Sequence, residues 1–179
     1  IIEQSARKLD VMTHNLVDLF LNLKDREPIT SVSFASIIDE VVAPYQAEAG
    51  DQVEIRKEIT QDGDFLSDEL KLKMIIKNLV FNAVKFRDAN KPASFVRVSS
   101  VSDANKLVLE IEDNGVGIAR ENLGQIFDAF YSADNEKGGS GVGLHIVKAT
   151  AENLGGSINV SSVPGEGTKF RMEIPNKHG

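Results

Sequence analysis

The spacing of apolar residues divides the chain into segments of two kinds. Apolar residues recur every three or four positions, as on a helix with one buried face, in residues 34–45, 67–86, 121–126 and 142–154. They alternate with polar residues, as in strands with one buried face, in residues 52–60, 95–101, 107–111, 157–160 and 169–174. The sequence SDANK between the second and third strands is rich in turn-forming residues, so we expect a hairpin there.

The N-terminal segment, residues 1–23, has the spacing of a coiled coil or helical bundle. Its seam positions lie four and three residues apart in turn, at Ile2, Ala6, Leu9, Thr13, Leu16, Phe20 and Leu23. No second helix of this pattern follows, so its partner helix is either outside this sequence or supplied by another copy. Residues 24–33 are polar, contain Pro28 and lack periodicity, which predicts a linker and a domain boundary.

Local sequence also indicates where the helices begin and end. We expect Ser31 or Ser33 to cap the helix at 34–45, and Pro44 to end or kink it near its last turn. Ser67 is expected to cap the helix at 67–86, with the two acidic residues after it at the positive end of the helix dipole. Residues 127–141 are polar, end in glycines and show no period, which indicates a candidate mobile lid.

The helix at 67–86 carries a polar stripe on an otherwise apolar surface. At about 100° of turn per residue, Asn78, Asn82, Lys85 and Phe86 fall within roughly a quarter turn of one another. Amide oxygens are hard ligands for Mg²⁺, an ammonium group can bind phosphate, and an aromatic ring can cover adenine, so the stripe suits a magnesium nucleotide. The simpler alternative is a solvated face of a partly exposed helix.

Composition limits the other possibilities. The chain has 179 residues, 41% of them hydrophobic, which is enough for one core of ordinary size and an appendage. It has no Cys and only three scattered His, so a disulfide framework, a thiolate metal site and a zinc cluster are excluded, and any metal would be bound by oxygen. The net charge of -7 disfavours a nucleic-acid surface.

The ends of the sequence leave its membrane association open. No apolar run approaches the roughly 20 residues of a membrane span. The chain begins in mid-pattern without Met, so we expect a piece of a longer protein, cytoplasmic in location and attached to a membrane only through segments outside this sequence.

Glycine-rich segments follow the polar stripe: DNGVGI (113–118) after a strand, GGSGVGL (138–144) before a helix, and GEGT (165–168) before the last strand. The N–H groups at a helix start can bind an anion, and glycine lets the anion approach the backbone. Taken singly, Asp113 could cap a turn, and the other two segments could be a flexible loop and a hairpin turn. A Rossmann site is disfavoured, because the helix-start glycines follow a loop and no acidic residue follows at the ribose spacing.

The order of these segments resembles the catalytic and ATP-binding domain of bacterial sensor histidine kinases, a branch of the GHKL superfamily of gyrase, heat-shock chaperone and mismatch-repair ATPases. Over roughly residues 32–175, NLVFNAVKF is similar to the N box, DNGVGI to the first glycine box, IFDAF to the F box, GGSGVGL to the second glycine box and GEGT to the third. The resemblance implies an α/β (α+β) two-layer sandwich, a mixed sheet with helices on one face, in residues 28–179. Residues 1–27 would be the end of the second dimerisation helix and a linker.

The resemblance also implies roles for individual residues. Asn82 would ligate Mg²⁺ with Asn78 close by, and Lys85 would contact phosphate; these three form the expected catalytic set. Phe86 stands where the family usually has Tyr against adenine, and Asp113 would accept a hydrogen bond from the adenine amino group. The remaining expected ATP-binding residues are Gly115, Gly117, Ile118, Phe127, Phe130, Lys137, Gly139, Ser140, Gly141, Val142, Gly143, Leu144 and Thr168. Among them, the two Phe would anchor the lid, and the Thr would support Asp113 from the next strand.

One position indicates the branch of the superfamily. ATP-hydrolysing relatives carry a Glu one helical turn before the metal-binding Asn, where it activates water, and this chain has Asn78 there. An amide cannot act as a base, so phosphoryl transfer to a positioned His is favoured over hydrolysis. Catalysis would then depend on aligning the γ-phosphoryl group with an imidazole and neutralising its charge.

Two departures from the family pattern qualify this expectation. The phosphoacceptor box, a His followed by an acidic residue and a Pro, is absent, since the sequence around His14 does not fit it. We therefore expect the chain to bind ATP without phosphorylating itself. An Arg that often follows the F box is replaced by Ser132; either Lys137 substitutes for it or γ-phosphate handling is weaker.

The expected function is therefore the ATP-dependent kinase domain of a two-component sensor, which phosphorylates a His helix of the same or a partner chain. Its expected partners are that helix, the receiver domain of a response regulator and, in the full-length protein, a second copy; this piece alone should be monomeric or weakly dimeric. A nucleotide-binding regulatory module without productive transfer is the alternative. An ATP-dependent clamp of the gyrase kind is disfavoured by Asn78 and the short lid.

Overall fold

The computed structural model describes residues 28–131 and 141–177, which form a sheet covered by helices. The strands are β1 (Thr30–Ser31), β2 (Val53–Gln61), β3 (Leu66–Ser67), β4 (Ser94–Ser102), β5 (Lys106–Asp113), β6 (Ser157–Val163) and β7 (Gly167–Pro175). The helices are α2 (Phe34–Ala49), α3 (Glu69–Lys85) and α4 (Gly143–Asn153), with short 3₁₀ turns η1 (Gly50–Gln52) and η2 (Arg120–Asn122).

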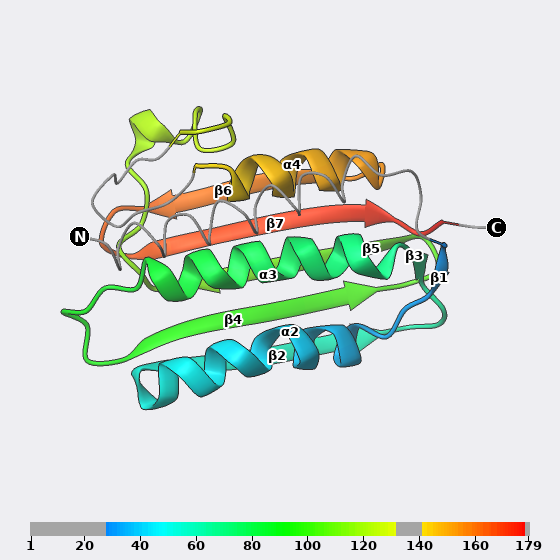
Figure 1. Ribbon diagram of the computed structural model, residues 1–179, viewed down its shortest axis with the longest axis horizontal. Helices are drawn as coiled ribbons and strands as arrows, with labels where there is room; N and C mark the ends of the chain where they lie inside the picture. The colour runs from blue at the N-terminus through cyan, green and yellow to red at the C-terminus, as the bar shows by residue number, and fades with distance from the viewer. Residues whose placement is uncertain (1–27, 132–140, 178–179) are drawn as a thin grey trace, which may run out of the picture.

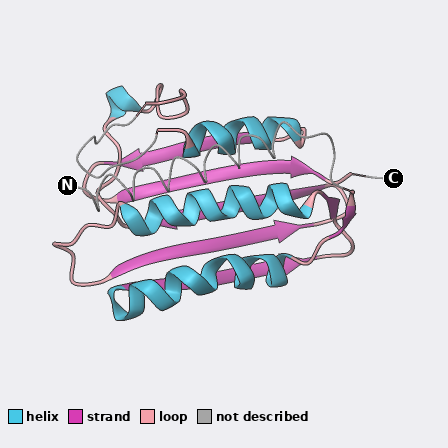
Figure 2. Ribbon diagram, in the orientation of Figure 1, coloured by secondary structure: helices cyan, strands magenta, loops and turns pink. Residues whose placement is uncertain are grey.

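The main sheet has the strand order β2-β4-β5-β7-β6, and β1 pairs with β3 in a small separate sheet. Strands β2 and β4 are parallel, whereas β4–β5, β5–β7 and β6–β7 are antiparallel. The three helices lie side by side on one face of the sheet, as Figures 1 and 2 show. The predicted two-layer mixed fold and the predicted β4–β5 hairpin are both confirmed.

The hydrophobic core lies between the helices and the sheet. Helix α3 is in the middle of the helical layer and contacts both α2 and α4, so a wide arc of its surface is buried. On the sheet side, alternate residues such as Val98 and Leu109 are fully buried beneath it. The remaining face of the sheet carries ion pairs, for example Arg171 with Glu110 (2.8 Å). Exposed pairs add only about 0–1 kcal/mol each, so they chiefly keep this face solvated.

Two expected helix ends are different in the structure. Ser33 caps α2 as expected, but of the two outcomes expected at Pro44 the helix does not end there, because α2 continues to Ala49. Pro44 lies on the exposed side, where water can reach the carbonyl group that loses its partner. Helix α3 is capped by Asp68, whose carboxylate accepts from the Lys71 N–H (3.0 Å).

The other two expected caps lie in the small β1–β3 sheet instead. Ser67, expected to cap α3, pairs with Thr30, and Ser31, the alternative cap of α2, pairs with Leu66. The helix expected at 121–126 is reduced to the 3₁₀ turn η2 followed by turns. Strands β6 and β7 extend beyond the predicted ranges, and they meet directly at the turn after Val163. The N-terminal helix and its seam lie outside the described residues, as do lid residues 132–140.

Candidate nucleotide-binding site

The polar stripe and the first glycine segment meet at one end of the two layers. Asn82, Lys85 and Phe86 occupy the last turn and the C-terminal cap of α3, and all three are half-buried. The carbonyl of Phe86 accepts a hydrogen bond from the Val116 N–H (3.0 Å), directly beside Asp113 at the end of β5. Figure 1 shows the end of α3, the end of β5 and the start of β7 at the same edge of the molecule. The candidate adenine and magnesium residues therefore share one region.

Asp113 is the most strongly perturbed acid in this region. Its Oδ1 accepts a hydrogen bond from the Gly115 N–H (2.7 Å), and Thr168 lies opposite it in the β5–β7 register. Burial raises the pKa of Asp113 to about 6, while hydrogen bonds from the N–H groups of Gly115 and Thr168 and the charge of Lys91 act in the opposite direction. Near neutral pH the carboxylate is therefore an acceptor held in a largely dry setting.

Glycine is required where the first and third glycine segments touch other backbone. A Cβ on Gly115 would collide with the carbonyl oxygen of Phe86, and a Cβ on Gly167 would collide with that of Asp113. The expected residues Gly115, Gly117 and Thr168 are thus brought together around the end of β5. Their close approach explains why these glycines are spaced as they are.

A serine that the sequence analysis did not single out links the same segments. Ser162 Oγ accepts from the Ile118 N–H (2.8 Å), donates to the Gly167 carbonyl (2.8 Å) and lies 2.9 Å from Thr168 Oγ1. Little in the sequence indicated this role. Ser162 is a polar residue at an inward-facing position of β6, and it lies beyond the range 157–160 that was predicted for this strand. Its hydroxyl therefore links the segment that follows Asp113 to the start of β7.

Asn78 is placed differently from the other stripe residues. Its side chain is buried, and its amide Nδ2 donates to the Met74 carbonyl one turn earlier in α3 (2.9 Å). A Cβ on Gly143, the first residue of α4, would lie 3.0 Å from Asn78 Oδ1, so this oxygen lies at the N-terminal end of α4. Gly141, Val142 and Leu144 flank this helix start. Gly139, Ser140 and Lys137 lie outside the described residues.

The two F-box rings behave differently. Phe127 packs edge-on against Phe170 of β7, with ring centroids 6.4 Å apart, which attaches the start of the predicted lid segment to the sheet. Phe130 is 80% exposed and has a positive φ of 67°. Its N–H donates to the Gly141 carbonyl (2.9 Å), which brings the two ends of the lid together through backbone atoms.

Lys85 and Asn114 complete the region. The Lys85 ammonium lies 5.0 Å from the centre of the Phe86 ring and 5.7 Å from that of Phe81, so the cation and the aromatic ring of the polar stripe are neighbours.

Asn114 Oδ1 accepts from the Phe95 N–H and its Nδ2 donates to the Ala93 carbonyl, both at 2.8 Å. Sequence analysis missed this role of Asn114, because both partners are backbone atoms at the start of β4, about 20 residues away in the sequence.

Nothing among the described residues resembles a protein-only metal centre. No cluster of three or more His, Asp or Glu that could hold a metal ion occurs in residues 28–131 and 141–177. The amide oxygens of Asn78 and Asn82 are hard ligands one helical turn apart, which fits Mg²⁺ that also uses phosphate oxygens. In the same described ranges, no helix is long and apolar enough to cross a membrane.

A mixed sheet with helices on one face, an Asp ending a central strand, and glycine turns packed around it define a nucleotide-binding ATPase domain. Residues 67–178 match the family of histidine kinase-, DNA gyrase B-, and HSP90-like ATPases, and the chain belongs to this family. The domain is the ATP-binding catalytic domain of the kind found in sensor histidine kinases of two-component systems.

Named relatives and a solved structure agree with this assignment. The chain is 28% identical to the autoinducer 2 sensor kinase/phosphatase LuxQ of Vibrio parahaemolyticus over 98% of its length, and 39% identical to the sensor histidine kinase GacS of Pseudomonas protegens over 61%. It spans only 23% and 12% of those proteins. Full-length ShkA in complex with AMPPNP superimposes with a TM-score of 0.76 at 26% identity, covering 94% of this chain and 36% of ShkA.

Proposed function

We propose that this domain binds Mg-ATP and transfers the γ-phosphoryl group to a His on a helix of the same or a partner chain. The observation that carries the proposal is that one helix, α3, contacts both candidate ligand-binding segments: its C-terminal end adjoins the turn after Asp113, and Asn78, about two turns earlier, lies against the start of α4. A buried carboxylate there can select the adenine amino group, and the N-terminus of α4 can bind phosphates.

The proposed roles follow from the position of each group. Asp113 accepts a hydrogen bond from the adenine amino group, and Phe86 covers the base. Lys85 and the backbone N–H groups in the first turn of α4, which precede the first intrahelical hydrogen bond at Ile146, bind phosphate oxygens. Asn82, with Asn78 behind it, holds Mg²⁺, which when bound neutralises charge on the transferred group.

Transfer is favoured over hydrolysis because the base position holds Asn78. A carboxamide is not basic enough to take a proton from water, and the hydrogen bond from its Nδ2 to the Met74 carbonyl holds it as a fixed dipole. Rate enhancement then comes from holding the γ-phosphoryl group in line with an imidazole nitrogen. In the complete protein we further propose a homodimer that passes the phosphoryl group to a receiver domain.

Labelled ATP tests this proposal in the full-length protein. The acceptor His should become labelled, and Asn82→Ala and Asp113→Ala should each reduce labelling by about 100-fold or more. Labelling that survives both substitutions would place the site elsewhere.

A regulatory module that binds nucleotide without transfer is the second candidate, favoured by Ser132 in place of the usual Arg. ATP binding that Asp113→Ala abolishes, together with no labelling of the His in the full-length dimer, would support this candidate instead.

A further inference from the structure

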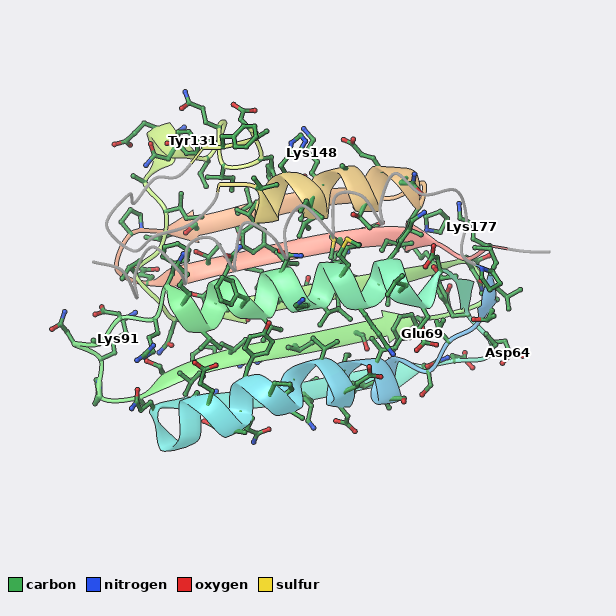
Figure 3. The ribbon with its side chains drawn as sticks, viewed as in Figure 1. Asp64, Glu69, Lys91, Tyr131, Lys148 and Lys177 are labelled. Carbon is green, nitrogen blue, oxygen red and sulfur yellow. The ribbon has the colours of Figure 1, made fainter. Side chains whose placement is uncertain are left out.

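A lysine outside every glycine segment contacts two of them. Lys91 lies in the loop between α3 and β4, at the edge of the molecule where Figure 3 labels it, and it is half-buried. Its Nζ lies 2.5 Å from the carbonyl oxygen of Asn114, 3.4 Å from that of Gly115 and 3.3 Å from that of Glu166.

These three contacts match the chemistry of an ammonium group. An ammonium has three N–H donors and no acceptor, and each donor here has one backbone carbonyl within reach. A hydrogen bond from a charged donor to a carbonyl group is stronger than one from a neutral donor. Two of the acceptors follow Asp113 directly, and the third is in the turn between β6 and β7, so Lys91 connects segments that lie far apart in sequence.

Other contacts join the same two segments: Thr168 donates its N–H to the Asp113 carboxylate, and the Ser162 hydroxyl bonds both the Ile118 N–H and the Gly167 carbonyl. The Gly165 N–H donates to the Val116 carbonyl (2.8 Å), and Gly167 packs against the backbone of Asp113. A displacement of the β6–β7 turn would therefore move the backbone that holds the Asp113 carboxylate. The cation opposes this movement by binding both turns.

The charge of Lys91 also acts on Asp113. The groups that face this carboxylate are the N–H groups of Gly115 and Thr168, the cation of Lys91 and the neighbouring carboxylate of Glu112. Lys91 favours the ionised form of Asp113, whereas Glu112 opposes it. Removing the cation would thus loosen the contact between the two turns and disfavour the ionised form of Asp113.

We propose that Lys91 is a positioning residue, which clamps the first and third glycine segments together and so holds Asp113 where it binds adenine. The proposal rests on the proposed ATP-binding function. It goes further in assigning part of the adenine selectivity to a loop residue whose hydrogen bonds within the described part of the chain go to backbone carbonyl groups.

The test compares Lys91→Met with Lys106→Met, an exposed lysine at the other end of β5 that pairs with Glu173. Calorimetric titration with ATP and with GTP, and hydrogen exchange of the Gly165 amide without nucleotide, are measured on each protein. Lys91→Met should weaken ATP binding by about 10-fold, a typical effect of losing charge-assisted hydrogen bonds, and speed exchange at Gly165. Lys91→Arg should recover part of both effects, and Lys106→Met should change neither.

Three outcomes separate the possibilities. Unchanged exchange at Gly165 in Lys91→Met would overturn the clamp, even if ATP affinity fell, because the lysine would then act on the nucleotide itself. Unchanged ATP affinity in Lys91→Met, with binding lost in Asp113→Ala, would also overturn it. Failure of the unsubstituted protein to bind ATP would overturn the proposed function, while the exchange measurement would still test the clamp.

Discussion

Asp113 shows how a single residue can trade stability for binding. Its carboxylate is largely removed from water, and burial raises its pKa from an ordinary 3.8 to about 6. Because the folded-state pKa lies above the unfolded one, the folded state is penalised wherever the group is ionised. This penalty is absent below about pH 4 and complete above about pH 6, where it reaches at most about 3 kcal/mol.

Asp113→Asn should therefore stabilise the nucleotide-free domain by about 1–2 kcal/mol near pH 7.5, since it removes the buried charge and keeps a carbonyl acceptor for the Gly115 N–H. The gain should vanish near pH 4, where Asp113 itself is neutral. Thermal unfolding at both pH values measures it, and ATP titration should show that binding is lost. A variant that is less stable than the original at both pH values would contradict the burial penalty.

Asn176 acts at the same scale but at the opposite end of the fold. Its buried amide accepts from the Leu66 N–H (2.7 Å) and donates to the carbonyls of Asp64 (3.0 Å) and Ala104 (3.1 Å). Asn176→Ala leaves these groups unpaired and should cost about 2–4 kcal/mol in the free energy of urea unfolding. Asn159→Ala, on the exposed side of β6, is the control and should cost less than about 0.5 kcal/mol. Equal losses in the two variants would contradict this role.

At the scale of elements, the site depends on two turns that meet edge to edge. The turn between β6 and β7 places Gly167 against the end of β5, and the turn after β5 places Gly115 against the end of α3. Strand pairing fixes the first contact, because Asp113 and Thr168 are partners in the β5–β7 register, and the hydrogen bond from the Val116 N–H to the Phe86 carbonyl supports the second. A change in either turn should therefore shift the Asp113 carboxylate, the group proposed to bind the base.

Two glycines of one turn provide a matched comparison. Gly165 has a φ of 79° and open space where a methyl group would be added, whereas a methyl group on Gly167, with a φ of 137°, would overlap the Asp113 backbone. Gly165→Ala should cost about 1 kcal/mol from backbone strain alone. Gly167→Ala should cost about 3 kcal/mol or more and also weaken ATP binding, as measured by urea unfolding and titration. Similar costs for the two substitutions would mean that the turns do not meet as described.

At the scale of the whole molecule, nucleotide binding and folding are linked. The proposed site takes residues from the end of β5, from α3 and from the start of α4, which come together only in the folded domain, so ATP should bind and stabilise the native state. Residues of the site come from segments that lie far apart in the sequence and meet only when the sheet and the helices have formed. The free energy of unfolding should therefore rise as ATP occupies the site.

Mg-ATP at about 100 times its dissociation constant should stabilise the domain by about 2.7 kcal/mol, which raises the melting temperature by several degrees. Removing Mg²⁺ with EDTA should reduce this shift, because Asn82 then loses its link to the phosphates. Scanning calorimetry of Asn82→Ala, with and without Mg²⁺, is the control and should show a smaller difference between the two conditions. An undiminished magnesium effect in Asn82→Ala would assign the ion to other ligands.

The pattern of apolar residues was enough to predict most elements. Strands β4 and β5 and helices α3 and α4 fall within one or two residues of their expected bounds, because each has one face that must be buried. The errors occur where propensity competes with tertiary contacts. Asp68 replaced Ser67 as the cap of α3 because Ser67 is held in β3, and Pro44 is tolerated within α2 because its side of the helix is exposed.

The sequence by itself determined the fold class, the family and the chemical types gathered in the site, because these depend on periodicity and on the order of the Asn, Asp and glycine segments. Only the tertiary structure decided that Lys91, Asn114 and Ser162 hold that site together. Their partners are backbone carbonyl and N–H groups, which every residue carries. No sequence pattern marks which of them a side chain will reach, so strand register and turn geometry decide it.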